Sequence, residues 1–213
     1  MHILAINGSP RKNRNTARLL HKVLEGATAQ GAHSEMTHLY QLDYKGCISC
    51  FMCKHVAGAS YGRCIIKDGL TPILRKAHQM DVLVMGTPLY FSYETAGMRA
   101  FLERLWFQYY LYKTINPTCA PPKKTAMLYT MNIKEEQMAE YGYDAVIKTT
   151  QTFMEKVFQK PCEVLLCPDT KQMDDYSHYE VDIFDVAAKD KRHKEIFPQY
   201  LEQARQLGIR LAG

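Results

Sequence analysis

The segment that most constrains the fold joins an apolar run to a polar loop and then to an amphipathic helical pattern. The apolar residues Ile3–Ile6 are followed by the loop Gly8–Thr16, after which leucine and valine recur at helical spacing through Leu24. A strand that delivers such a loop to a helix N-terminus presents unpaired backbone N–H groups and the positive end of the helix dipole. This arrangement predicts an anion-binding site, and we expect a phosphate there.

The side chains of this loop narrow the kind of phosphate. The loop has a single glycine, so it lacks the GxGxxG pattern of dinucleotide-binding loops and the Gly-Lys-Ser/Thr ending of nucleoside triphosphate loops. A hydroxyl-rich loop instead suits a terminal monophosphate, such as that of FMN in a flavodoxin-like sheet. The alternative is an ordinary turn whose polar residues only cap the helix. The candidate phosphate-binding residues are Ser9, Arg11, Asn13, Asn15 and Thr16.

Apolar runs alternate with helical patterns along the whole chain. We predict strands at Ile3–Asn7, His33–Leu39, Asp81–Thr87, Thr125–Met131 and Cys162–Cys167. Helices are expected at Thr16–Gln30, Leu70–Met80, Ala96–Tyr110, Tyr143–Gln159 and Lys191–Leu211. This alternation predicts an α/β fold, a flavodoxin-like three-layer sandwich with a five-stranded parallel sheet of order 2-1-3-4-5. The length suits one domain over residues 1–213, and Pro168–Ile183 is expected to be an irregular surface segment.

Composition argues against several classes of function. The formal net charge is +5, but lysine and arginine are spread along the chain, so we predict no nucleic-acid partner. No apolar stretch approaches the roughly 20 residues that span a bilayer. A strand pattern also begins directly after Met1, so we expect a cytoplasmic protein without membrane attachment.

A second loop at the same sheet edge is rich in aromatic residues. In an open parallel sheet the ligand lies outside the carboxyl ends of the strands, so the loops after the first, third and fourth strands should cooperate. The loop after the third strand could present N–H groups and aromatic edges to a flat ring, although its rings could equally pack against helices or a second subunit. Its candidate residues are Pro88, Leu89, Tyr90 and Phe91. The segment Tyr129–Asn132, with the candidates Met131 and Asn132, would form a third wall, or is simply the end of the fourth strand.

Four segments together resemble a known family. They are Gly8–Thr16, Cys47–Cys53 with Gly62–Cys64 and Lys67–Asp68, Thr87–Phe91, and Gly97–Arg104. They resemble the flavodoxin-like NAD(P)H-dependent FMN reductases, and within them the branch that includes the iron–sulfur flavoproteins. The resemblance implies non-covalent FMN, NAD(P)H as co-substrate and a homodimer or homotetramer. It places the phosphate on the first of these segments and the flavin ring on the third.

The function expected from this resemblance is an FMN-dependent NAD(P)H oxidoreductase that passes electrons to a flavin, a quinone or a similar small-molecule acceptor. The flavin carries the chemistry, so no catalytic acid or base is predicted from the chain. The alternative is a non-enzymatic flavoprotein that shuttles electrons between protein partners. Flavodoxins tend to be acidic, and the basic charge of this chain favours the reductase.

Four of the seven cysteines crowd into one segment as Cys47, Cys50, Cys53 and Cys64. Four thiolates with two-residue gaps between the first three could ligate a [4Fe–4S] cluster. The gap Lys54–Arg63 is longer than in the iron–sulfur members of the family, which favours free thiols over a cluster. A structural zinc site is a third alternative, but zinc usually takes two separated pairs of ligands.

Overall fold

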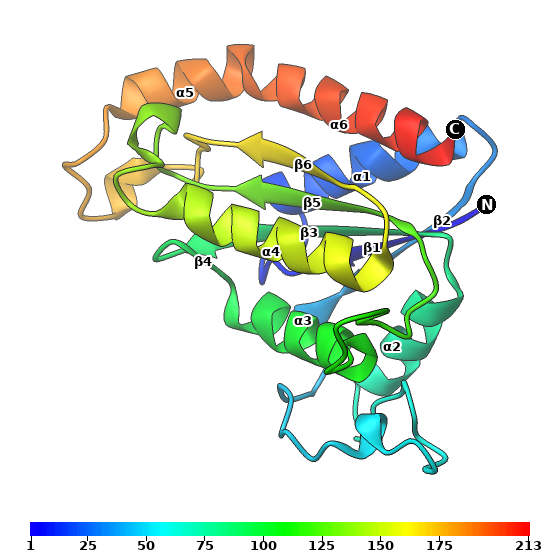
Figure 1. Cartoon of the computed structure of the whole chain (residues 1–213). Coiled ribbons are helices and arrows are strands. Elements are labelled where there is room, and N and C mark those ends of the chain that lie inside the picture. Colours follow the sequence, from blue (N-terminus) through cyan, green and yellow to red (C-terminus); the bar gives the residue numbers. More distant parts are fainter.

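The computed structural model describes residues 1–213 and shows a parallel sheet between two layers of helices (Figure 1). The parallel strands are β1 (His2–Asn7), β2 (His33–His38), β3 (Val82–Tyr90), β5 (Lys124–Thr130) and β6 (Cys162–Cys167). Their order is β2-β1-β3-β5-β6, which confirms the predicted order of five parallel strands. The flavodoxin-like fold class is therefore confirmed.

A short sixth strand was not predicted. β3 continues past Thr87 to Tyr90 and turns back into β4 (Tyr93–Glu94), which pairs with it antiparallel. The two turn residues, Phe91 and Ser92, both have positive φ, at 50° and 70°. Two-residue hairpin turns of this kind usually contain glycine or asparagine, so the sequence carries no ordinary signal for the hairpin.

Helices cover both faces of the sheet. On one face lie α1 (Asn15–Thr28), α5 (Val186–Glu195) and α6 (Phe197–Ala212), and on the other lie α2 (Leu70–Gln79), α3 (Ala96–Tyr109) and α4 (Tyr143–Phe158) (Figure 1). The single C-terminal helix predicted at Lys191–Leu211 is two helices. Pro198 lies in the first turn of α6, and a proline there cannot continue a helix from α5 because it lacks an N–H group.

Side chains alternate between the two layers along each central strand, as strand geometry requires. Leu4 and Ile6 of β1 belong to the core beneath α2, α3 and α4, whereas Ile3 and Ala5 belong to the core beneath α1 and α6. α1 and α6 approach so closely that a Cβ on Gly26 would lie 2.0 Å from the carbonyl oxygen of Arg205. This packing fixes α1, whose N-terminus follows the phosphate-loop candidate.

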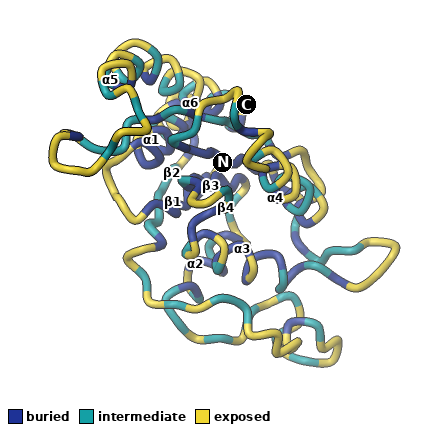
Figure 2. The backbone as a smooth tube through the Cα atoms, turned by 90° about the vertical axis from the view of Figure 1, so that its left-hand side faces the viewer, coloured by how far each residue is buried: buried dark blue, intermediate teal, exposed yellow.

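Two irregular segments lie outside this frame. The connection between β2 and α2 passes beneath α3, at the bottom of Figure 1, and its backbone is largely exposed or half-buried in Figure 2. The connection between β6 and α5 contains only the short helical turn Tyr176–His178, as expected for an irregular segment. No helix in the chain combines the length and apolar character needed to cross a bilayer.

Candidate flavin site and cysteine pocket

Three loops converge at the carboxyl edge of the sheet, after β1, β3 and β5. They form one pocket, lined by Ser9, Arg11, Arg14, Asn15, Thr16, Pro88, Leu89, Tyr90, Thr130, Met131, Asn132, Thr170 and Gln172. All of the residues predicted to bind FMN line this pocket except Asn13 and Phe91. The side chain of Asn13 is exposed beside the loop, and Phe91 stands at the hairpin tip, 97% exposed.

The N-terminus of α1 offers the pocket a set of free backbone donors. The N–H groups of Lys12, Asn13, Asn15, Thr16 and Ala17 make no hydrogen bond within the chain. The residue that precedes the helix, Arg14, makes no side-chain cap, and the first turn contains no acidic residue. The polar side chains of the loop therefore do not cap the helix, and the donors and the positive end of the dipole fit an anion.

The loop itself is fixed from both sides. The N–H group of Gly8 donates to the carbonyl oxygen of Gly86 at 2.8 Å, and the Thr95 hydroxyl donates to the carbonyl oxygen of Gly8 at 2.7 Å. Thr95 also accepts a bond from the N–H group of Met98 and so caps α3. A Cβ on Gly8 would lie 2.8 Å from the Cβ of Met98, so the close approach of β1 and α3 requires glycine here.

A hydroxyl pair closes the floor of the pocket. The hydroxyl oxygens of Thr16 and Thr130 lie 2.8 Å apart, and both residues are buried. Buried hydroxyl groups need partners, and this pair joins the start of α1 to the end of β5. Thr130 lies in the segment predicted as the third wall, but its pairing with Thr16 could not be predicted, because the two residues are far apart in the sequence.

The segment Thr170–Asp174, which we call the strap, passes over the phosphate-loop candidate. The Asn15 side-chain amide donates to the carbonyl oxygen of Lys171 at 2.8 Å, and the Arg11 guanidinium donates to the carbonyl oxygen of Gln172. Arg14 forms an ion pair with Asp174, and the hydrogen bonds from Arg14 lower the pKa of this carboxyl. Two side chains predicted to bind phosphate, Arg11 and Asn15, are therefore engaged by the strap.

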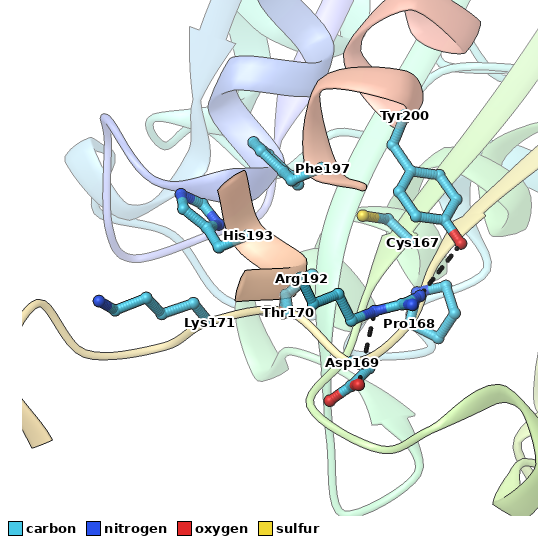
Figure 3. Close-up of a pocket in the computed structure, with 9 residues that line it drawn as sticks. All are labelled: Cys167, Pro168, Asp169, Thr170, Lys171, Arg192, His193, Phe197 and Tyr200. Atoms are coloured by element: carbon cyan, nitrogen blue, oxygen red, sulfur yellow. Dashed lines mark hydrogen bonds and ion pairs between the residues drawn. The ribbon is translucent and has the colours of Figure 1, made fainter. Parts of the chain in front are cut away.

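α5 holds the base of the strap in place. Figure 3 shows Arg192 between Asp169 and the Tyr200 hydroxyl, at 3.4 Å and 3.5 Å. The buried Lys189 also pairs with Asp169. Its ammonium group donates to the carbonyl oxygen of Asn132, in the loop after β5, at 2.9 Å. The strap is thus anchored to the helix that follows it. Sequence reasoning missed this, since the segment has no periodicity and its contacts are distant in the chain.

The hairpin presents an aromatic edge above the pocket. Leu89 is buried, whereas Tyr90 and Tyr93 are 42% and 61% exposed. Burial of its inner part raises the pKa of the Tyr90 phenol, so this group stays neutral near neutral pH. Pro88, Leu89 and Tyr90 line the pocket together with Met131 and Asn132 of the loop after β5.

A second pocket lies beneath α3 and collects the clustered cysteines. Its lining consists of Cys47, Ile48, Cys50, Phe51, Cys53, Cys64, Ile65, Ile66, Arg104, Phe107 and Gln108. All seven cysteines of the chain are free thiols, and burial raises the pKa of Cys53. No three His, Cys, Asp or Glu side chains of residues 1–213 are gathered closely enough to hold a metal ion as they stand. The donor chemistry still fits iron, because four thiols share one largely apolar pocket.

Comparison with known proteins identifies the family. A sequence profile of the NADPH-dependent FMN reductases matches residues 1–128, and the chain belongs to this family. The resemblance to this family, inferred from the sequence, is therefore confirmed.

Curated relatives include iron–sulfur flavoproteins of two archaea. One, from Methanocaldococcus jannaschii, is 32% identical over 104 residues, which cover 49% of this chain and 51% of the relative. Another, from Archaeoglobus fulgidus, is 36% identical over 104 residues, covering 49% and 48%. The chain thus spans about half the length of the curated relatives that it matches.

Solved structures share the fold over the whole chain. The NAD(P)H:quinone oxidoreductase from Methanothermobacter marburgensis has a TM-score of 0.70 at 16% identity, covering 100% of this chain and 98% of that chain. The azoreductase from Bacillus anthracis has a TM-score of 0.65 at 14% identity, with 99% of both chains covered. At these identities the likeness shows the fold alone.

Proposed function

We propose that this chain binds FMN at the carboxyl edge of the sheet and passes electrons from NAD(P)H through it to a flavin, a quinone or a similar acceptor. The observation that carries the proposal is the pocket itself. Asn15 and Thr16, which start α1 with free N–H groups, line the same cavity as Leu89 and Tyr90 of the hairpin after β3. The residues that we assign to the phosphate and those that we assign to the ring thus line one cavity, which supports a flavin mononucleotide as the ligand.

In this proposal the phosphate is bound chiefly by backbone groups. Asn15 and Thr16, whose N–H groups are free, line the pocket together with Ser9, so their N–H groups and the Ser9 and Thr16 hydroxyls are the nearest donors. Arg11 and Asn15 would reach the phosphate only by leaving the carbonyl oxygens of the strap. We therefore assign Ser9 and Thr16 to direct binding, and Arg11 and Asn15 to a second role in holding the strap over the site.

The ring would lie between the hairpin and the β5 loop. When bound, FMN accepts a hydride from the nicotinamide and releases electrons to the acceptor. The chain positions the ring with Pro88, Leu89 and Tyr90 on one side and Met131 and Asn132 on the other. Phe91 lies outside the pocket, where its exposed ring could meet the nicotinamide, the acceptor or another subunit.

We also propose that the chain self-associates as a homodimer or homotetramer through this hairpin. Tyr90, Phe91 and Tyr93 expose aromatic surface, and the Ser92 hydroxyl ties the turn to the carbonyl oxygen of Tyr141 at 2.8 Å. Exposed aromatic side chains clustered at one place favour a protein interface. Sedimentation should show the oligomer, and Phe91→Asp should shift it toward monomer; an unchanged oligomer would place the interface elsewhere.

A [4Fe–4S] cluster held by Cys47, Cys50, Cys53 and Cys64 is the second part of the proposal. The long gap before Cys64 favours free thiols when the sequence is considered alone. Two observations now support the cluster instead: the four thiols line one pocket, and the curated relatives are named iron–sulfur flavoproteins. Iron and sulfide measured in protein purified or reconstituted without oxygen test this assignment.

The reductase proposal is tested by anaerobic mixing of the FMN-loaded protein with NADH or NADPH. We expect the flavin absorption to bleach with at least one of the two and to return when a quinone or free flavin is added. A flavin that stays oxidised with both nicotinamides, yet is reduced by a reduced carrier protein, would support the electron-carrier alternative and overturn the reductase.

A further inference from the structure

Two buried hydrogen-bond donors on α3 have no partner. They are Nε of Arg104 and Nε2 of Gln108, and these residues are 1% and 4% exposed. The two residues stand four positions apart, so they lie on the same face of the helix. Both line the pocket that the four cysteines share.

The other polar atoms of these two side chains are all engaged. The terminal nitrogens of Arg104 donate to both carboxylate oxygens of Asp68, at 2.6 Å and 3.2 Å, and to the carbonyl oxygens of Lys45 and Ile66, at 3.1 Å and 3.4 Å. Oε1 of Gln108 accepts from the N–H group of Cys64 at 3.2 Å. These contacts bind α3 to the segment Lys45–Asp68, which we call the cysteine segment. They leave one N–H donor unpaired on each of the two side chains.

Buried donors in native proteins are almost always paired, so an unpaired one calls for a specific explanation. The rest of the pocket lining consists of apolar side chains and thiols. Among the side chains that line the pocket, the cysteine sulfurs are the only acceptors besides Oε1 of Gln108, which is already engaged. The sulfur atoms of an iron–sulfur cluster accept N–H hydrogen bonds, and such bonds help set its reduction potential.

We propose that Arg104 Nε and Gln108 Nε2 donate N–H···S hydrogen bonds to an iron–sulfur cluster held by the four cysteines, and that these bonds raise its reduction potential. The inference rests on the proposed cluster and adds to it the residues that tune it. One-electron reduction adds a negative charge to the cluster, so donors aimed at its sulfurs stabilise the reduced form more than the oxidised form.

The position of the two donors also relates the cluster to the flavin. α3 begins directly after the β3–β4 hairpin, with Thr95 as its N-cap, and Arg104 follows nine residues after Thr95. At a rise of 1.5 Å per residue this is about 13 Å along the helix axis. α3 therefore connects the two sites: its N-terminus adjoins the hairpin beside the proposed flavin ring, and the two proposed cluster donors lie farther along the same helix.

Two variants remove the donors with little change in charge. Arg104→Lys keeps a cation opposite Asp68 but lacks Nε–H, and Gln108→Met is neutral and similar in length. Arg205→Lys and Gln203→Met, on α6 away from the pocket, are matched controls. In an anaerobic redox titration followed by electron paramagnetic resonance, we expect each donor variant to favour the oxidised cluster about tenfold, a shift of roughly 59 mV for one electron. The controls and the potential of bound FMN should not move.

A second measurement needs no substitution. Arginine labelled with ¹⁵N in the otherwise unlabelled wild-type protein should give a nitrogen hyperfine coupling in pulsed electron paramagnetic resonance of the dithionite-reduced cluster. The same holds for glutamine labelled in its side-chain amide. This readout remains valid if a variant loses its cluster or fails to fold.

The outcomes separate the two proposals. Lowered potentials in the donor variants together with the ¹⁵N couplings support the donor assignment. A cluster whose potential is unchanged in both variants and which shows no coupling to labelled Arg or Gln overturns that assignment while leaving the cluster intact. Wild-type protein that takes up no iron and sulfide on anaerobic reconstitution overturns the cluster and the donors together.

Discussion

The pocket at the carboxyl edge and the cysteine pocket beneath α3 differ in which hydrogen-bond donors have no partner within the chain. At the carboxyl edge the free donors are backbone N–H groups, while the side chains of Arg11 and Asn15 are bonded to the strap. Beneath α3 the backbone N–H groups of Cys47 and Cys64 are paired with side chains of the helix. There the free donors belong to side chains.

This difference has a physical origin. The first pocket follows from topology, because parallel strands bring their loops to one edge whatever the loops contain. The second pocket exists only because an irregular connection packs on one face of a helix. Substitutions should therefore affect the cysteine pocket more severely than the flavin pocket, where much of the binding comes from backbone that side-chain changes leave in place.

The largest effect is expected from Cys53→Ser. Removing one of four thiolate ligands should eliminate nearly all bound iron, because serine is a poor ligand for an iron–sulfur cluster. FMN binding should be unchanged, since the flavin pocket shares no residue with the cysteine pocket. Iron, sulfide and flavin assays on the same sample measure both quantities. Cys119→Ser, outside the pocket, is the control, and full iron retention in Cys53→Ser would show that the cluster lies elsewhere.

Arg104→Met should strongly destabilise the protein. It leaves the Asp68 carboxylate, which is 16% exposed, without its buried cation. Breaking a buried ion pair costs about 3–5 kcal/mol, and the partial exposure of Asp68 favours the lower end of this range. The free energy of unfolding from urea titration measures the effect.

The control for this substitution is Arg210→Met, whose ion pair with Glu163 is more than one-third exposed on both sides. An exposed pair contributes about 0–1 kcal/mol. Equal losses in the two variants would contradict the view that the Arg104 pair anchors the cysteine segment to α3.

Ser9→Ala combined with Thr16→Ala should weaken FMN binding by at least tenfold. Each change removes a hydroxyl near the proposed phosphate, and hydrogen bonds to charged groups contribute about 1.5–3 kcal/mol. The free N–H groups of α1 remain, so binding should persist at higher flavin concentration. Fluorescence titration of FMN measures the affinity. Thr28→Ala with Ser34→Ala, an exposed hydroxyl pair far from the pocket, is the matched control. An affinity equal to this control would refute the assignment of the phosphate.

Asp174→Asn should have the smallest effect. The carboxylate lies at the surface and pairs only with Arg14, so its loss loosens one end of the strap while Lys189 and Arg192 still hold the base. We expect FMN to dissociate faster by less than about fivefold, the range for exposed ion pairs. The dissociation rate after dilution checks this, with Asp182→Asn as the control. A much larger acceleration would mean that the strap contributes directly to flavin binding.

The sequence predicted the frame of the molecule better than its irregular parts. The apolar runs of β3 and β5 have no polar alternation, as expected for central strands covered on both faces. The strand order follows from short right-handed crossovers. The strap could not be predicted, because Lys171 and Gln172 act through carbonyl oxygens that any residue type would supply. The hairpin was missed because Phe91 and Ser92 adopt positive φ without glycine.

The cysteine pocket shows the same limit. The spacing of the cysteines indicates the chemistry of the ligands, whereas the gathering of Cys64 with the other three depends on packing against α3. The roles of Arg104 and Gln108 also follow only from packing, since a helix sequence does not show which polar atoms remain unpaired. What the sequence does establish is the set of loops that meet at the carboxyl edge.

The most direct test of this account is a crystal structure of the anaerobically reconstituted protein with FMN, with diffraction also recorded at the iron absorption edge. We predict the phosphate within hydrogen-bond distance of the N–H groups at the start of α1, with the ring against Pro88 and Tyr90. We also predict an anomalous peak among Cys47, Cys50, Cys53 and Cys64. A flavin bound away from the carboxyl edge would contradict the proposed function, and a correctly placed flavin without iron would contradict the proposed cluster.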